Sequence, residues 1–303
     1  MMDRRQFIRH SLQAAIATAA SGALPVLDLV PLVEAASGPA LAVRKGTDIP
    51  LLVRDTLDAL GGIEQIVKPG ETVVVKPNIG WDRTVEMAAN THPDVVRTVV
   101  QLCLEAGAGQ VRIFDRTCND PRRCYVQSGI QEAIDSIRSS RVKLEHIDRR
   151  AFQDVALKGG VALDEWSFYK PALDADRYIN IPVAKHHSIS TVTLAMKNTM
   201  GVIGGNRGAL HRRIDESLAD INSVIHSDLT IVDATRILVA NGPQGGLMKD
   251  VRRTNSLIAS TDIVAADSYA ATLFGHRPED IPTIVAGARR GLGIMDLSRV
   301  RMV

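Results

Sequence analysis

The chain has 303 residues, of which 45% are hydrophobic and 23% are charged, and its mean hydropathy is +0.03. This composition is typical of a globular chain with a sizeable core and excludes disordered and fibrous proteins. With 36 basic and 34 acidic residues the net charge is only +2, and aromatic residues make up 4%, so we expect no nucleic-acid partner.

The first 35 residues have the pattern of a twin-arginine signal peptide. Arg4 and Arg5 precede an uncharged, Ala-rich stretch at 11–27, and small residues around Ala35 are typical of a cleavage site. A membrane anchor is the alternative, but the uncharged stretch is shorter than the roughly 20 apolar residues that a spanning helix needs. We therefore predict a signal peptide at 1–35, a periplasmic mature protein and no stable membrane anchor after cleavage.

From about residue 40, short β-branched runs alternate with segments of helical period. Strands are expected near 40–43, 72–75, 111–114, 142–147, 178–183, 229–232 and 256–259, and helices near 49–66, 93–106, 125–137, 191–200, 216–226, 265–273 and 281–290. Such alternation predicts an α/β fold with a mostly parallel sheet and helices on both faces. The segment 148–176 is interpreted as a connection with a short hairpin. Since no linker rich in Pro, Gly or Ser interrupts the pattern, we predict a single domain at 36–303.

Three cysteines remain in the predicted mature chain. Cys118 and Cys124 lie in one short polar segment, and an oxidising compartment favours a disulfide between them. A pair of metal-bound thiolates is the alternative, but no second CxxC or His pair lies nearby. Cys103 falls on one helical face with Val96 and Val99, so we expect it to be a buried thiol.

Polar residues follow four of the expected strands. They are Lys76, Pro77 and Asn78 after 72–75, Asp115 after 111–114, Lys185, His186 and His187 after 178–183, and Asp233 after 229–232. Because ligands bind outside the carboxyl ends of parallel strands, we expect these groups along one edge of the sheet. An anion or Asp233 would neutralise the lysines, which otherwise repel one another.

Each of these groups also has a purely structural interpretation. Pro77 lacks an N–H and ends strand pairing, so it turns Lys76 and Asn78 toward the sheet edge, although a strand-end lysine is often simply exposed. Asp115 by itself is more typical of a turn or cap than of a catalyst. Adjacent histidines on an extended chain point to opposite sides, and we assign His187 to the site.

The helix expected at 191–200 carries Lys197 and Asn198 at the edge of its apolar face. A lysine in that place either extends to solvent or has a functional partner. Gly-rich segments follow at 201–208 and 241–246. The first lacks the ending of a P-loop, so a helix C-cap followed by a loop is favoured over an anion cradle, and the second indicates a turn.

Several of these motifs together resemble the domain of unknown function 362 family. The matching stretches are Val75-Lys76-Pro77-Asn78, Thr91-His92-Pro93, Lys185-His186-His187, Thr193 to Gly201, Asp233-Ala234, Gly242 to Gly246 and Ser260 to Asp267. They extend over about residues 70–275, and the resemblance strengthens the choice of these residues as a site. Some family members are joined to ferredoxin-like iron–sulfur domains; this sequence has no CxxCxxC run, so we expect none here.

Three functions are compatible with this pattern. The first is an exported enzyme for a small carboxylate or phosphate, whose lysines bind the substrate oxygens while His187 transfers a proton. The second is a non-catalytic anion-binding module, which needs the lysines but no titratable base. The third is a metal or cofactor protein with His187, Asp233 and either Asp262 or Asp267 as ligands, although Asp262 also suits the cap of the helix at 265–273 and no HxxxH-type spacing is present.

We favour the enzyme and expect a small anionic ligand as its partner. Its predicted site consists of Lys76, Asn78, Lys185, His187, Lys197, Asn198 and Asp233. The sequence assigns no metal ligand, cofactor or oligomeric state.

Overall fold

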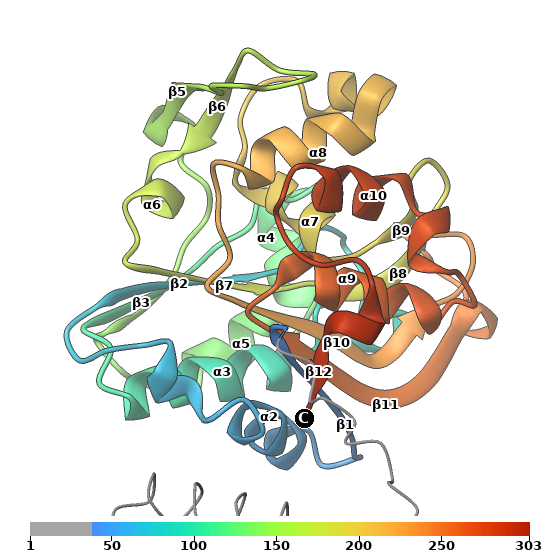
Figure 1. Ribbon diagram of the computed structural model, residues 1–303. Coiled ribbons are helices and arrows are strands. Elements are labelled where there is room, and N and C mark those ends of the chain that lie inside the picture. The colour runs from blue at the N-terminus through green and yellow to red at the C-terminus, as the bar shows by residue number, and fades with distance from the viewer. Residues whose placement is uncertain (1–37) are drawn as a thin grey trace, which may run out of the picture. The chain divides into compact units, whose positions relative to one another are not determined.

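A computed structural model of the protein describes residues 38–303 (Figure 1). The predicted signal peptide lies outside these residues, so export and the single-domain organisation from residue 36 stay predictions. Among the described residues, no helix combines the length and apolar character needed to cross a bilayer.

The described chain contains one large sheet and one separate hairpin. The strands of the large sheet are β1 (Ala40–Lys45), β2 (Thr72–Pro77), β3 (Gln110–Ile113), β4 (Val142–Leu144), β7 (Arg177–Ile181), β8 (Val183–His187), β9 (Thr191–Thr193), β10 (Leu229–Leu238), β11 (Val251–Ser260) and β12 (Arg301–Met302). Their order is β12-β1-β11-β10-β7-β2-β3-β4, and β8 pairs with both β10 and β9. Pairing is parallel from β10 through β4, whereas β11 runs antiparallel to β1 and β10. The predicted mostly parallel sheet is confirmed.

The hairpin consists of β5 (Phe152–Ala156) and β6 (Glu165–Tyr169), which pair antiparallel within the predicted connection. The helices are α2 (Ile49–Asp58), α3 (Pro93–Glu105), α4 (Pro121–Gln127), α5 (Ile130–Asp135), α6 (Lys170–Leu173), α7 (Ala195–Asn198), α8 (Ile214–Asn222), α9 (Ile263–Thr272) and α10 (Pro282–Arg289). Figure 1 shows α2, α3 and α5 on one face of the sheet and α7 to α10 on the other, so the predicted helices on both faces are confirmed.

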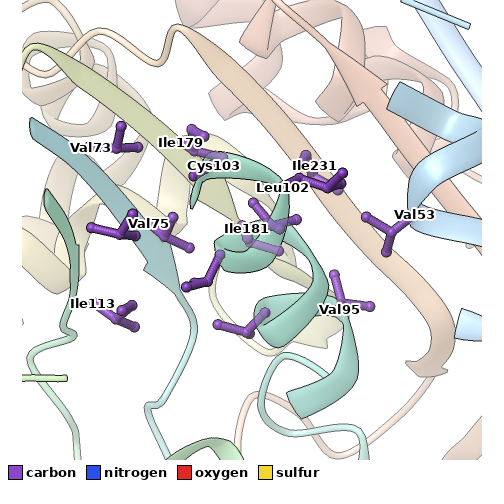
Figure 2. Close-up of a cluster of buried hydrophobic side chains, with 14 of the residues drawn as sticks. Val53, Val73, Val75, Val95, Leu102, Cys103, Ile113, Ile179, Ile181 and Ile231 are labelled. Atoms are coloured by element: carbon purple, nitrogen blue, oxygen red, sulfur yellow. The ribbon is translucent and has the colours of Figure 1, made fainter. Parts of the chain in front are cut away.

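The alternation of side chains along the strands explains why helices cover both faces. Val73 and Val75 of β2 pack into a cluster with α2, α3 and α5, while Val74 between them joins a cluster on the opposite face with Phe114. Figure 2 shows the first cluster, in which side chains of α3 lie against the strands. Cys103 of α3 is fully buried there, as predicted, and burial raises the pKa of its thiol to about 12.

The segment 191–200 is not the predicted helix. Thr191 to Thr193 form β9, which folds back antiparallel on β8, and only the four residues of α7 are α-helical before a 3-10 turn begins at Thr199. The β-branched Thr-Val-Thr run favours a strand, and a pattern of apolar residues this short fits either element.

The predicted disulfide between Cys118 and Cys124 is wrong in this structure. The three cysteines of the described chain are free. Cys124 lies in α4 with its side chain buried and its Sγ 3.7 Å from the carbonyl oxygen of Gly80, whereas Cys118 is exposed. The helix therefore turns one thiol into the core, although the two cysteines are close in sequence.

Candidate functional site

A cavity of about 600 Å³ opens where β2, β3 and β8 end. Its charged and polar lining comes from segments far apart in the sequence and includes Asn78, Asp115, Arg116, Lys185, His187, Thr193, Lys197, Asn198, Arg207 and His211. This is the sheet edge that the strand-end pattern indicated, because carboxyl ends of parallel strands meet there.

A buried ion pair forms part of the floor of the cavity. Lys76 has no exposed surface, and its Nζ lies 2.8 Å from Oδ1 of Asp115, whose Oδ2 accepts a hydrogen bond from the Ile79 N–H. Burial lowers the pKa of Lys76, and the Asp115 carboxylate opposes that shift. Asp115, and not Asp233, is therefore the carboxylate that neutralises a site lysine.

Two asparagines connect Lys76 to the second lysine of the site. Lys76 Nζ donates to Oδ1 of Asn198 at 2.9 Å, and Nδ2 of Asn78 donates to the same oxygen at 3.1 Å. Lys185 Nζ in turn donates to Oδ1 of Asn78 at 2.9 Å and to the carbonyl oxygen of Ala89 at 2.6 Å. Burial lowers the pKa of Lys185 to about 7. The amide oxygens thus fix both lysine side chains by accepting hydrogen bonds from them.

Neighbouring elements hold these asparagines in place. Asn198 Nδ2 donates to Asn180 Oδ1 of β7 at 2.8 Å, and Asn180 Nδ2 donates to the carbonyl oxygen of Ala195. The backbone N–H of Asn78 donates to Thr91 Oγ1, which donates onward to the carbonyl oxygen of Ile181. The next residue, His92, is the N-cap of α3, since its Nδ1 accepts from the Asp94 N–H.

Gly201 lies directly against the buried pair. A Cβ at this position would be 1.8 Å from Asp115 Oδ1 and 2.4 Å from Lys76 Nζ, which is far inside contact distance. The first Gly-rich segment therefore contributes a close backbone approach over Lys76 and Asp115, whereas the predicted helix C-cap is Thr199, before this segment begins.

His187 is held as a neutral hydrogen-bond donor. Its Nδ1 accepts from the backbone N–H groups of Ile189 at 3.1 Å and Ser190 at 3.2 Å, so the proton of the neutral ring is on Nε2. Burial and the nearby Lys197 and His211 lower the pKa of His187 to about 3. The ring is therefore suited to donating to an anion or a carbonyl oxygen, and less to the predicted role of base.

Lys197 has a different environment from the other two lysines. Its Nζ lies 3.4 Å from Met200 Sδ and 3.4 Å from His211 Nε2, and no carboxylate oxygen of the described chain lies within 4 Å of it. Burial lowers its pKa to about 8. His211, which stacks on His187 with ring centroids 5.9 Å apart, was not among the predicted site residues.

Two arginines add positive charge to the cavity. Arg207 donates to the carbonyl oxygens of Arg116, Met200 and Thr117, and Arg116 donates to those of Ile203 and Gly205. These bonds tie the Gly-rich segment 201–208 to the loop after β3. Four lysine and arginine side chains thus line the cavity together with one carboxylate, that of Asp115, which is already paired with the buried Lys76.

Comparison with known proteins identifies the family. The sequence profile of the domain of unknown function DUF362 matches residues 73–272, which include every residue of the predicted site. The chain belongs to the DUF362 family. It is also 32% identical over 253 residues to a thylakoid-associated protein of Synechocystis, covering 79% of this chain and 74% of that protein.

Two solved structures are similar to this DUF362 chain at low sequence identity. A protein of Thermotoga maritima matches with a TM-score of 0.50 and 14% identity over 77% of this chain and 61% of its own. The lactate racemase apoprotein of Thermoanaerobacterium thermosaccharolyticum matches with a TM-score of 0.47 and 11% identity over 78% of this chain. The chain spans 61% and 56% of the lengths of these two proteins.

Within the family match, the structure separates Asp233 from the other predicted site residues. Asp233 is fully buried and does not line the cavity. Its two oxygens accept from the backbone N–H of His92, from the N–H and hydroxyl of Thr235, and from Arg236 at 2.9 Å. Desolvation acts to raise the pKa of Asp233, but Arg236 and these donors outweigh it and lower the pKa.

The other two carboxylates considered as metal ligands also have structural partners. Asp262 is the N-cap of α9, accepting from the Ala265 N–H, as the sequence suggested. Asp267 accepts from the backbone N–H groups of Ala195 and Met196, the first two residues of α7, while burial raises its pKa to about 7. No group of three His, Cys, Asp or Glu side chains that could hold a metal ion occurs within residues 38–303.

Four residues of this site or its support were missed or undervalued: Asn180, Asp115, Thr193 and His211. Asn180 had a visible signal, because it is a polar residue inside the apolar run Tyr-Ile-Asn-Ile. Thr193 pairs with Lys185 across the β8–β9 ladder, lines the cavity and has a buried Oγ1 with no hydrogen-bond partner in the described chain.

Proposed function

We propose that this protein is an enzyme that binds a small organic anion, a carboxylate or a phosphate, in the cavity at the ends of β2, β3 and β8. The observation that carries the proposal is the charge balance of the site: Lys185, Lys197 and two arginines line the cavity, whereas Asp115, the carboxylate of that lining, is already paired with the buried Lys76. Buried cations without counter-charge are costly, and a bound anion offsets that cost.

The roles of the residues follow from their contacts. The Lys76–Asp115 pair and the two asparagines form a rigid floor, and Lys185 presents its charge from that floor to the ligand. His187 donates from Nε2 to the same ligand. Site groups that are held by other protein groups keep their geometry when the ligand arrives, which favours binding and catalysis.

A catalytic function is favoured over simple anion binding by Lys197. This amine contacts no carboxylate, and its pKa of about 8 lies near physiological pH, where an acid–base group exchanges protons efficiently. His211 Nε2 at 3.4 Å supplies a partner for the proton. We therefore assign proton transfer to the pair Lys197 and His211, in place of His187.

Calorimetry at low salt tests anion binding, with lactate and inorganic phosphate as probes and chloride at equal ionic strength as the reference. Lys185→Met should weaken binding of the preferred anion roughly 10- to 100-fold, the worth of a charged hydrogen bond. Lys158→Met removes an exposed lysine far from the cavity lining and should change nothing. If neither anion binds more tightly than chloride, the proposal fails.

Proton exchange distinguishes the enzyme from a binding module. Lactate and pyruvate are incubated with the protein in D₂O, and deuterium at their carbons is followed by NMR. We expect exchange into at least one of them and its loss in Lys197→Met. Tight binding without exchange in either probe would support the non-catalytic module.

The same proposal includes export through the twin-arginine pattern at Arg4 and Arg5. The expected result is mature protein in the periplasmic fraction and retention of the double Arg→Lys variant in the cytoplasm, because the pair is read by a receptor and charge alone does not suffice. Export of the double variant would contradict the proposal.

A further inference from the structure

We propose that Lys197 forms a covalent imine with its ligand, so that the substrates are small aldehydes or ketones that carry a carboxylate or phosphate. This inference rests on the proposed anion site and adds a reacting group to it.

The first support is the difference between the three lysines. Lys76 and Lys185 each donate to protein oxygens at 2.6–2.9 Å, so the protein already holds their nitrogens. Lys197 contacts only a thioether sulfur and an imidazole nitrogen, both at 3.4 Å. Because its nitrogen lines the cavity and no oxygen of the described chain holds it, Lys197 is the lysine placed to offer a lone pair to a ligand there.

The second support is the orientation of His211. Its Nδ1 lies 3.3 Å from the carbonyl oxygen of Gly208, which can only accept, so Nδ1 carries the proton of the neutral ring. The lone pair of Nε2 then faces Lys197 Nζ. A nucleophile, a base within reach and a third group that orients the base form the arrangement expected for an activated amine.

The third support is His187, whose tautomer is the opposite one. Because its Nδ1 accepts two backbone N–H bonds, its Nε2 carries the proton. The two stacked rings therefore provide one acceptor, which faces the amine, and one donor, which is available to a carbonyl oxygen. Thr193 Oγ1, buried and without a partner in the described chain, adds a second hydrogen-bonding group on the ligand side.

The reaction balances without an oxidant or reductant. Lys197 transfers one proton to His211, and its nitrogen lone pair forms a bond to the carbonyl carbon while the C=O π bond breaks and the oxygen takes one of the two protons on that nitrogen. The C–O bond of this carbinolamine then breaks as the nitrogen lone pair forms the C=N bond, and the hydroxyl group leaves as water with the proton that His211 had accepted. The product is a protonated imine on Lys197, and water is the only by-product.

Trapping with sodium cyanoborohydride tests the inference in the unmodified full chain. The reagent delivers hydride to the protonated imine and leaves a stable secondary amine, which peptide mass spectrometry assigns to a residue. The probes are pyruvate and dihydroxyacetone phosphate, which distinguish a carboxylate from a phosphate substrate. We expect a Lys197 adduct with at least one of them, at least tenfold above any adduct on the exposed Lys158.

Matched probes and variants show which property is needed. Acetone has the carbonyl without the anion and should give at least tenfold less adduct on Lys197. His211→Gln should slow trapping at least tenfold at neutral pH and move its optimum to higher pH, because the amine then loses its proton acceptor. A change in yield without a change in the pH profile would assign His211 a structural role only.

The result that overturns the inference is measured in the same preparation that binds the anions. If lactate or phosphate binds tightly and neither carbonyl probe gives a Lys197 adduct above the Lys158 background, the imine is wrong and the anion site stands. If no anion binds at all, the proposed function itself has failed. Adducts that persist in a folded Lys197→Arg variant would show that another amine reacts.

Discussion

Asp115 and Asp233 are both buried carboxylates on the central sheet, 2.8 Å from Lys76 and 2.9 Å from Arg236, and the two pairs are used differently. Asp233 accepts four hydrogen bonds, two on each oxygen, so it has no acceptor site left for a ligand. Asp115 shares its oxygens between Lys76 and one backbone N–H, and it lines the cavity. A saturated ion pair builds the fold, whereas the pair under the cavity supports the asparagine and lysine side chains that face a ligand.

The largest effect should come from breaking the saturated pair. Asp233→Ala leaves the guanidinium of Arg236 buried without its carboxylate, and we expect the free energy of unfolding to fall by about 3–5 kcal/mol. Urea denaturation measures this loss. The anion affinity of the folded fraction should stay within about twofold of the wild-type value, because Asp233 does not line the cavity. A specific loss of anion binding would show that Asp233 is part of the site.

A smaller loss is expected from a methyl group placed against the other pair. Gly201→Ala puts a carbon 1.8 Å from Asp115 Oδ1, so Lys76 and Asp115 must move. We expect about 3 kcal/mol of destabilisation, the upper end for overpacking, together with a loss of anion affinity. Gly46→Ala is a suitable control, because a Cβ there meets only the Leu52 side chain at 3.7 Å, and it should leave anion binding unchanged. Equal anion affinity in both variants would show that the floor does not position the ligand.

The pH dependence of stability sharpens the comparison further. Burial lowers the pKa of Lys185 from 10.5 to about 7 in the folded chain, so between these values the unfolded chain binds more protons than the folded one. Stability from this group therefore rises with pH, by about 2 kcal/mol between pH 7 and pH 9. In urea titrations at the two pH values, the free energy of unfolding of Lys185→Met should increase less than that of the wild type by this amount. A bound anion should reduce the increase seen in the wild type. Identical slopes in wild type and variant would contradict the assigned pKa.

The smallest effect is expected at Thr193. Thr193→Val removes an unpartnered hydroxyl and keeps the shape, so stability should change by less than about 1 kcal/mol in either direction. Affinity for the preferred anion should fall by about 3- to 10-fold if the hydroxyl binds the ligand. Thr191→Val, on the same strand but outside the cavity lining, is the matched control. Unchanged affinity at Thr193 would remove it from the site.

The sequence was sufficient to predict the fold class and the sheet edge of the site. Alternating strands and helices indicated a parallel sheet, and the rule for strand ends led to Lys76, Asn78, Lys185 and His187. The structure brings these four residues together with Lys197 and Asn198. The predictions of the fold class and the sheet edge succeeded because they depend on the periodicity of short segments and on the direction of the strands, which can be inferred from the sequence.

The choice between Asp115 and Asp233 could not be made from the sequence. Both follow apolar residues of an expected strand, and their roles depend on partners that only the fold brings close. β10 continues beyond Asp233, and a register shift between Ala234 and Arg236 accompanies the pairing of Arg236 with that carboxylate. Likewise, the tautomers of His187 and His211 depend on backbone groups of loops whose conformation no motif specifies.

The contact between Lys76 and Asn198 joins residues 122 positions apart in the chain, and Asp115 comes from a third segment between them. Closing such long loops costs conformational entropy before any contact is formed, and folds dominated by contacts of this kind assemble slowly. The cavity is therefore completed only when most of the chain has folded. An incomplete fragment that ends before residue 198 lacks part of the floor and cannot retain a weakened version of this site.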